Sequence, residues 1–274
     1  MTRPRFPVAR VGALAAIVVA AFLVSQRAGG THWRELAPGA EFTTLRGDPY
    51  CRAGSSAIGV LRLDPARVRL RVRHFSREPE RRPLPITEWQ RRSEAFAVFN
   101  AGQYYGDYSY MGLLAAGGRL VSRRPHPTYR AALVAGPRGG GAGARVLDLS
   151  RERLDADSLG WEEVAQSFML FDRAGTVRVR RSDQVAPRTA VAEDRRGRLV
   201  VLTTEGGYTL RDFAELLQRS PLDLALAMAM DGGREAEMLV RAGGFRYASF
   251  GQWERGLPPV APVPLPAVVT VATR

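Results

Sequence analysis

The sequence contains no lysine, although it has 40 basic residues against 27 acidic ones and a formal charge of +13. It also has a single asparagine, Asn100, and only three isoleucines. Because lysine, asparagine and isoleucine all use AT-rich codons, these shortages indicate a GC-rich genome and an arginine excess that is partly mutational. A strong positive charge ordinarily suggests a nucleic-acid partner. That inference is weakened here, and we expect no nucleic-acid partner.

Cysteine and histidine are scarce as well. The one cysteine, Cys51, excludes an internal disulfide and a multi-cysteine metal cluster. The three histidines are isolated and form no HExxH pair, which argues against a zinc hydrolase. No G-x-S-x-G element is present for a serine hydrolase, and the glycine-rich stretch 136–144 lacks the lysine of a P-loop. The sequence therefore requires no cofactor, and whether a divalent cation binds stays open.

The N-terminus carries an uncharged apolar run at 11–24, preceded by three arginines. A helix of that length reaches about 21 Å, short of the roughly 30 Å hydrocarbon core, and suits a secretory signal. Small residues at 28–30 offer a cleavage site, although Arg27 stands beside them. Residues 1–30 are therefore predicted to be either a cleaved signal peptide or an uncleaved membrane anchor. In both cases the protein is exported, to the periplasm, the cell exterior or the outer side of a membrane.

Residues 31–274 have the length and composition of one globular domain. Strands and a few helices follow one another without regular alternation, which predicts an α+β fold with mixed sheets. Capping-box patterns predict helices starting at Thr87 and Thr209. Strands are predicted at 58–74 (two strands joined at Asp64-Pro65), 96–99, 188–205 (a hairpin turning at 194–197), 224–230 and 267–273 (a last edge strand).

One predicted strand alternates strictly between apolar residues and arginine. Val68, Leu70 and Val72 are flanked by arginines at 67, 69, 71 and 73, the period of a half-buried strand. The arginine row is either a solvated sheet face or a surface that binds an anionic polymer, and the pattern by itself allows both.

Three short segments carry polar groups beside apolar strands: Asn100-Ala101-Gly102, Arg188-Thr189 and Asp231-Gly232-Gly233. Glycine permits a turn or the close approach of a ligand, a strand-end aspartate suits catalysis or cation binding, and arginine suits phosphate or carboxylate binding. If the strands share a sheet, their ends open on one edge. We therefore predict that Asn100, Arg188 and Asp231 meet in one pocket with the three glycines as its backbone floor. Each segment taken alone also reads as an ordinary turn or cap.

Across about residues 33–272 the sequence resembles the phosphodiester glycosidase family. No single motif establishes the resemblance, but the number of matching motifs and their order along the chain are specific to the family. The resemblance rests on the opening at 33–45, VLRLDP (60–65), NAG (100–102), MGLLAAGGRLVS (111–122), AQSFMLFDRAG (165–175), RTAVAEDRRGRLVV (188–201), TLRDFAELL (209–217), MDGG (230–233) and VPLPAVVTV (263–271).

The resemblance implies hydrolysis of a sugar joined through its anomeric carbon to a phosphodiester, so the expected partner is a carbohydrate or sugar phosphate. It implies Asp231 as the carboxylate near the anomeric carbon. Glu205, at the end of its predicted strand, is either a second carboxylate of the site or a surface residue at the end of the hairpin. Asn100 and Arg188 would bind the sugar or the phosphate. Gly102, Thr189, Gly232 and Gly233 complete the predicted substrate site.

One departure from the family pattern is clear. Members commonly have a small, hydroxyl-rich loop after the aspartate and two glycines, whereas Arg234-Glu235-Ala236-Glu237 follow here. The departure and the positive charge keep a second function open, a non-catalytic protein that binds anionic envelope polysaccharide. Turnover of a sugar phosphodiester separates the two functions.

Overall fold

The computed structural model describes residues 32–251 and 262–274. The chain separates into two units, Met1–His32 and Trp33–Arg274, and the fold below is that of the second unit. The signal peptide or anchor predicted at 1–30 lies outside the described residues and stays a prediction. Among the helices of the described ranges, none combines the length and apolar character needed to cross a membrane.

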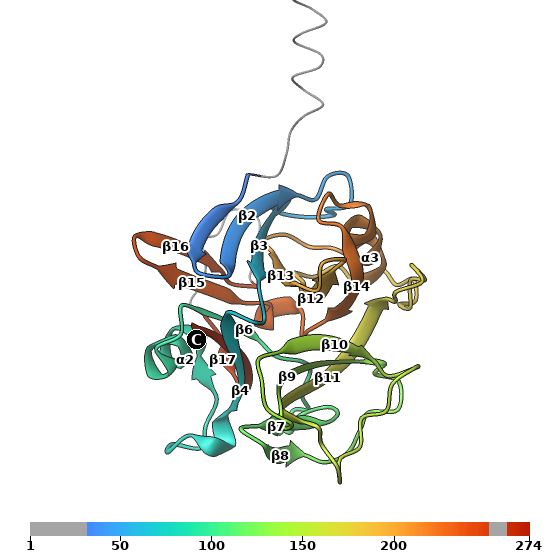
Figure 1. Ribbon diagram of the computed structural model, residues 1–274. Coiled ribbons are helices and arrows are strands. Elements are labelled where there is room, and N and C mark those ends of the chain that lie inside the picture. The colour runs from blue at the N-terminus through green and yellow to red at the C-terminus, as the bar shows by residue number, and fades with distance from the viewer. Residues whose placement is uncertain (1–31, 252–261) are drawn as a thin grey trace, which may run out of the picture. The chain divides into compact units, whose positions relative to one another are not determined.

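The larger of the sheets has eleven strands, and every strand pair in it is antiparallel (Figure 1). Nine strands follow the order β1-β2-β3-β13-β12-β14-β11-β7-β8, while β9 pairs with both β11 and β10. The strands are β1 (Arg34–Ala37), β2 (Ala40–Arg46), β3 (Ala57–Leu63), β7 (Leu114–Ala116), β8 (Arg119–Ser122), β9 (Ala131–Pro137), β10 (Ala144–Asp148), β11 (Trp161–Phe171), β12 (Thr189–Asp194), β13 (Leu199–Thr204) and β14 (Leu224–Ala229).

A second antiparallel sheet has the order β16-β15-β6-β18-β4. Its strands are β4 (Val68–His74), β6 (Ala97–Asn100), β15 (Met238–Ala242), β16 (Phe245–Ser249) and β18 (Ala267–Thr273). The prediction of β18 as an edge strand is wrong, because β18 lies between β6 and β4 and pairs with both. The short strands β5 (Leu84–Pro85) and β17 (Pro264–Leu265) form a separate pair.

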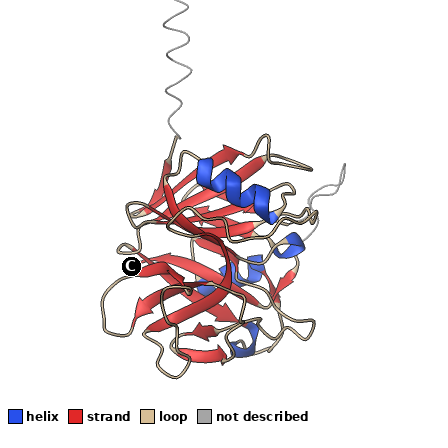
Figure 2. Ribbon diagram, turned by 90° about the vertical axis from the view of Figure 1, so that its right-hand side faces the viewer, coloured by secondary structure: helices blue, strands red, loops and turns tan. Residues whose placement is uncertain are grey.

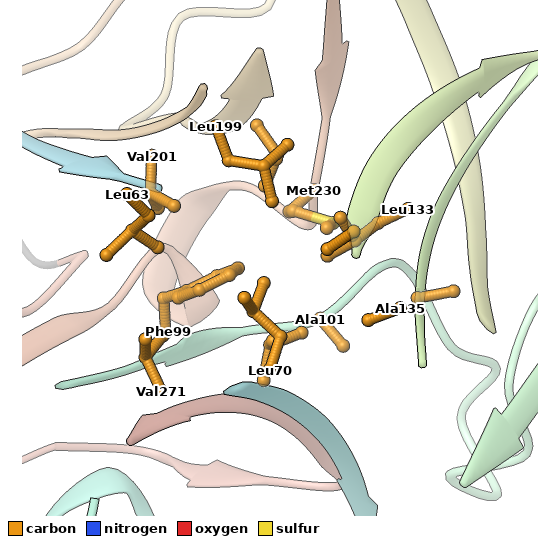
Figure 3. Packing of buried hydrophobic residues seen from close by; sticks show 14 of the residues in the cluster. Leu63, Leu70, Phe99, Ala101, Leu133, Ala135, Leu199, Val201, Met230 and Val271 are labelled. Carbon is orange, nitrogen blue, oxygen red and sulfur yellow. The ribbon is translucent and has the colours of Figure 1, made fainter. Parts of the chain in front are cut away.

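The main hydrophobic core lies between the two larger sheets. In Figure 3, Leu63 and Val201 of the eleven-stranded sheet pack toward Leu70, Phe99 and Val271 of the five-stranded sheet, and all five belong to one buried cluster. The alternation predicted for β4 is confirmed, because Val68, Leu70 and Val72 are buried while Arg69 and Arg71 are exposed. The strands on either side of Asp64-Pro65 therefore exist as predicted, yet β3 and β4 enter different sheets.

Within residues 32–251 and 262–274 the helices are few and short beside the strands (Figure 2). Helix α3 (Leu210–Arg219) begins as predicted, since the Thr209 side chain accepts a hydrogen bond from the Asp212 amide. Its buried face consists of Phe213, Ala214, Leu216 and Leu217.

The capping box predicted at Thr87 is wrong. Helix α2 (Ile86–Ser93) begins one residue earlier, and Pro85 occupies the N-cap position without any side-chain cap. Pro85 belongs to β5, so the start of the helix is set by that strand rather than by a hydroxyl group. Gln90 donates instead to the Phe96 carbonyl oxygen. Two single-turn helices, η1 (Phe75–Arg77) and η2 (Gly233–Glu235), complete the described elements.

The predicted α+β class, with sheets and a few packed helices, is confirmed. The sheets were expected to be mixed, whereas every strand pair of the described residues is antiparallel. The 188–205 hairpin is present as β12 and β13, and the 224–230 strand as β14. The glycine-rich stretch forms the turn between β9 and β10, with its two ends inside those strands.

Candidate functional site

Asn100 is the last residue of β6, and its side chain is 1% exposed. The amide nitrogen Nδ2 donates to the backbone carbonyl oxygens of Ala101 and Asp231, at 3.1 and 2.9 Å. The amide oxygen Oδ1 accepts from the Glu237 amide at 3.1 Å. These bonds hold the loop after β14 against the end of β6. Through these contacts Asn100 positions the backbone of the Asp231 loop. Its contact with substrate stays a prediction.

Arg188 directly precedes β12 and is buried. Its Nε donates to the Tyr208 carbonyl oxygen at 2.9 Å and its Nη2 to the Gln184 carbonyl oxygen at 2.7 Å. Its Nη1 lies beside Gly232. Burial lowers the pKa of Arg188 to about 10, while the Asp231 carboxylate acts in the opposite direction. The guanidinium thus stays charged at neutral pH with one nitrogen directed at the Asp231 loop.

Asp231 follows β14 by one residue and is partly exposed. Its amide donates to the Ala101 carbonyl oxygen at 3.0 Å, and its Oδ1 accepts from the Gly232 amide at 2.9 Å. Burial of the carboxyl group, aided by the negative charge of Glu235, raises the pKa of Asp231 to about 7. The Gly232 amide and Arg188 act against that rise. The carboxyl group is therefore poised between its two protonation states near neutral pH.

The residues next to these three side chains anchor the site in the core. Ala101 and Met230 point into the buried cluster between the sheets (Figure 3). The Met230 amide donates to the Thr189 carbonyl oxygen at 2.8 Å, and the Gly233 amide to the Pro187 carbonyl oxygen at 2.9 Å. Backbone bonds therefore fix the Asp231 loop to the residues on either side of Arg188. Thr189 itself is buried within the sheet.

Asn100, Arg188 and Asp231 come together, but not along one sheet edge as we expected. None of the three lines a cavity described below, so the shared pocket stays a prediction. Arg188 and Asp231 stand at the same end of the antiparallel pair β12–β14, in which Ala190 faces Ala229. Asn100 comes from β6 of the other large sheet. The site lies where the ends of strands from two packed sheets meet.

Glycine is favoured at each of the three positions of the predicted floor for a different structural reason. A Cβ on Gly102 would lie 2.3 Å from the Tyr110 hydroxyl oxygen, and one on Gly232 would lie 3.1 Å from Arg188 Nη1. Gly233 has a φ of +76° at the start of η2, a conformation that favours glycine. Packing and backbone geometry thus explain these positions, and their predicted part in binding substrate stays a prediction.

Glu205 follows β13 and its carboxylate accepts from the Ser55 hydroxyl at 2.9 Å. Its amide donates to the Ala57 carbonyl oxygen at 3.0 Å. Among the interactions of residues 32–251 and 262–274, none joins Glu205 to Asn100, Arg188 or Asp231. Its role as a second carboxylate stays a prediction.

Glu235, in η2, is a carboxylate near Asp231. The sequence marked it only as part of the altered loop and not as a residue of the site. Its Oε1 accepts from the Tyr104 hydroxyl at 3.1 Å. The Asp231 carboxylate also acts on three tyrosines, Tyr104, Tyr110 and Tyr129, and helps to raise their pKa values; that of Tyr129 rises to about 12, mainly through burial. We call Tyr104, Tyr105, Tyr108, Tyr110 and Tyr129 the tyrosine wall. The four tyrosines between 104 and 110 are the sequence signal that could have indicated it.

Two glutamines on this side of the domain hold the surrounding loops. Gln103 donates from Nε2 to the Met230 carbonyl oxygen at 2.9 Å and accepts from the Ser167 hydroxyl at 2.8 Å. Gln166 accepts from the Leu113 and His126 amides and donates to the Tyr129 carbonyl oxygen. Gln166 lies within a stretch that carries the family resemblance, Gln103 directly follows one, and both bind backbone atoms.

Two cavities share residues with the tyrosine wall. One, of about 860 Å³, is lined by Tyr105, Tyr108, Tyr110, Arg123 and Arg124 among others. The second, of about 420 Å³, is lined by Tyr129 and Gln166, and the two cavities have 125–127 in common. Tyr105 and Tyr108 are 49% and 42% exposed, which is unusual for large aromatic residues and leaves ring surface open to a ligand. Within the described part of the chain, no three His, Cys, Asp or Glu side chains are grouped to hold a metal ion.

Residues 93–263 match the sequence profile of the phosphodiester glycosidase family, which is more than half of the 274-residue chain. The chain therefore belongs to the phosphodiester glycosidase family. No curated protein matches the chain significantly in sequence.

Solved structures share the fold at low sequence identity. The catalytic domain of zebrafish N-acetylglucosamine-1-phosphodiester alpha-N-acetylglucosaminidase, auto-inhibited by its pro-peptide, superposes with a TM-score of 0.64 at 14% identity, over 89% of this chain and 88% of that chain. A hypothetical protein from Synechocystis gives 0.63 at 13% identity over 90% of this chain, which spans 64% of the Synechocystis chain. A Burkholderia pseudomallei protein described as exported gives 0.52 at 11% identity, over 81% of this chain and 76% of that chain.

Proposed function

We propose that this protein hydrolyses a sugar-1-phosphodiester in a cell-surface or extracellular glycan. The observation that carries the proposal is the Asp231 carboxyl group, on which the charges of Glu235 and Arg188 both act, at the place where β6 and β14 end and β12 begins. Membership of the phosphodiester glycosidase family supports the reaction class. The zebrafish enzyme, named for cleavage of N-acetylglucosamine-1-phosphodiesters, supports a substrate of that kind.

The proposed reaction breaks the bond between the anomeric carbon and a phosphate oxygen and adds water, releasing a free sugar and a phosphate monoester. The transition state carries positive charge on the sugar ring, which an ionised carboxylate stabilises or attacks. The phosphate leaves as a stable anion and needs a positive anchor more than a proton. Asp231 supplies the carboxylate, Arg188 the positive charge, and Glu235, held by Tyr104, a second carboxylate.

The proposed position of the substrate follows from the tyrosine wall. Exposed faces of Tyr105 and Tyr108 offer flat apolar surfaces on which a sugar ring packs, while Arg123 and Arg124 offer positive charge. The cavity that they line holds about 860 Å³, which falls within the usual size of small-molecule sites. Tyr110 lines this cavity and lies close enough to Asp231 for the carboxylate to help raise its pKa. In our proposal the sugar phosphodiester extends from Asp231 toward this cavity.

The test is turnover of a panel of chromogenic sugar-1-phosphodiesters by the wild-type protein and two variants. Asp231→Asn should lower activity by at least about 100-fold, the lower range for loss of a positioned acid or base. Asp223→Asn is the matched control, because Asp223 stands at the other end of β14 in an exposed pair with Arg195 and should change little. Near-normal turnover by Asp231→Asn would remove Asp231 from the mechanism. No turnover of any substrate by the wild type would favour the anionic polysaccharide-binding function instead.

A further inference from the structure

The outer face of β4 carries arginines that the proposed reaction does not use. Arg69 and Arg71 are exposed on the face opposite to the buried Leu70 and Val72. Side chains on one face of a strand recur about every 6.6 Å. Neither Arg69 nor Arg71 forms an ion pair with another residue in the described parts of the chain. Glu163 is the carboxylate on which the charge of Arg71 acts, and that charge lowers the pKa of Glu163 against the effect of burial.

These arginines line cavities. One cavity of about 590 Å³ and another of about 320 Å³ share Arg69, Arg71 and Glu163. Together they are lined by six arginines against three glutamates: Arg69, Arg71, Arg73, Arg77, Arg138 and Arg274, with Glu78, Glu162 and Glu163. We call these two adjoining cavities the arginine groove.

Two acidic residues of the arginine groove, Glu78 and Glu163, already have partners within the protein. Glu78 pairs with Arg73 at 3.0 Å. Glu163 accepts through Oε2 from the Val72 and Gly117 amides, and burial raises its pKa, which disfavours its charged form. The groove consequently keeps an excess of positive charge.

The walls of the groove leave room for an extended ligand. Its base is formed by small side chains of β18, Thr270 and Ala272, which pair with Arg71 and Arg69. On the other side stands the glycine-rich turn between β9 and β10. A Cβ placed on Gly140 or Gly141 there would have no atom within 4 Å. Regularly spaced arginines beside an open, small-residue surface suit a chain of repeated negative charges.

We propose that the arginine groove binds an anionic polysaccharide at a site separate from Asp231. The binding of a polyanion rests on the groove itself, while the choice of a polysaccharide rests on the proposed function. Neither cavity is lined by Phe, Tyr or Trp, the side chains on which single-stranded nucleic acids stack. His74 lines both the groove and the cavity beside the tyrosine wall. A long glycan chain held in the groove would thus lead toward the proposed reaction site.

The experiment measures binding of fluorescently labelled polygalacturonate across a series of NaCl concentrations, with neutral dextran as the uncharged comparison. The double variant Arg69→Gln/Arg71→Gln should weaken binding by at least about tenfold, because two charge-assisted contacts are lost. Wild-type binding should weaken as salt increases. Arg241→Gln/Arg246→Gln is the matched control. These two exposed arginines face each other on β15 and β16, and replacing them removes the same amount of charge. The control should bind as the wild type does.

Several results would overturn the proposal: no salt-sensitive binding by the wild type, equal binding by the groove variant, or equal loss in the control variant. Tighter binding of a thymidine oligonucleotide than of polygalacturonate, through the same two arginines, would assign the groove to nucleic acid. Hydrolysis of the small chromogenic phosphodiester should be unchanged in the groove variant. If the wild type shows no hydrolysis but the groove variant still loses polygalacturonate binding, the groove stands and the proposed reaction fails.

Discussion

At the scale of single residues, the Asp231 carboxyl group is the centre of the candidate site because some neighbouring groups raise its pKa while others lower it. Burial and Glu235 favour its neutral form, and Arg188 with the Gly232 amide favours its charged form. The balance brings its pKa to about 7. A group in this balance responds to small changes in nearby charge.

The first prediction concerns pH. The ionised form of Asp231 is the one that stabilises positive charge on the sugar, and it is populated above its pKa of about 7. We therefore expect kcat/KM for a sugar-1-phosphodiester to rise with pH and to reach half its maximum near pH 7. The measurement is a pH–rate profile. Activity that instead falls as pH rises through 7 would show that Asp231 acts in its protonated form.

The Glu235→Gln variant tests the same balance. Removing the negative charge of Glu235 should lower the pKa of Asp231 and move the midpoint of the profile to lower pH. The glutamine amide oxygen can still accept from the Tyr104 hydroxyl. Glu215→Gln on α3, where Glu215 pairs with Arg211, is the control and should leave the midpoint in place. An unchanged or raised midpoint in Glu235→Gln would contradict the assigned coupling.

A second residue-scale prediction concerns Asn100. Asn100→Ala leaves the Glu237 amide and the Asp231 carbonyl oxygen without their side-chain partner in a buried setting. We expect the free energy of unfolding to fall by about 1–3 kcal/mol. Urea unfolding measures this, with Gln218→Ala as the control, because Gln218 makes a single exposed bond to Gly175 and its loss should cost under about 0.5 kcal/mol. Equal effects of the two substitutions would argue against a positioning role for Asn100.

At the scale of the secondary-structure elements, the sequence predicted a helix start correctly where a nearby side chain bonds to the first backbone amides of the helix. Helix α3 has a threonine cap and one apolar face, and both are visible in consecutive residues. Helix α2 carries the same type of capping pattern, but the preceding Pro85 is held in the pair β5–β17. A partner strand nearly 180 residues along the chain therefore decides where α2 begins, and no local pattern reports it.

The third prediction compares the two capping threonines. Thr209→Ala removes the acceptor of the Asp212 amide and should lower the free energy of unfolding by about 1 kcal/mol. Thr87→Ala removes no cap, because Pro85 occupies the N-cap of α2, and should change stability by less than about 0.5 kcal/mol. Urea unfolding of both variants checks this. A larger loss from Thr87→Ala than from Thr209→Ala would contradict the observed caps.

At the scale of the whole domain, the candidate site depends on how two sheets pack. Ala101 and Met230 are both buried in the core between the sheets, and this packing brings the Asn100 amide to the Asp231 carbonyl oxygen. The five-stranded sheet also places the arginines of β4 on its outer face. One arrangement of sheets thus creates both the candidate reaction site and the arginine groove.

The fourth prediction concerns the whole chain and its destination. We propose that the protein is exported, because three arginines precede the apolar run at 11–24. Residues 1–40 fused to a reporter that is active only outside the cytoplasm should give activity. The same fusion with two apolar residues, Val18 and Val19, replaced by arginine is the control and should be inactive. A stable but silent wild-type fusion would contradict export.

The sequence by itself determined the α+β class, most strands, the buried face of β4 and the cap of α3. It also determined which three segments carry polar groups at strand ends. Each of these follows from interactions between residues a few positions apart, which repeat with the period of a helix or a strand.

Only the tertiary structure decided which strands become neighbours. It placed β18 inside its sheet rather than at the edge, brought Asn100 to Asp231 from a different sheet, and set Glu235 beside Asp231 while Glu205 bonds to Ser55. The physical reason is that alternation records which face of a strand is buried but not what buries it. Pairing between distant strands depends on the packing of the whole core, and the surroundings of each site residue follow from that packing.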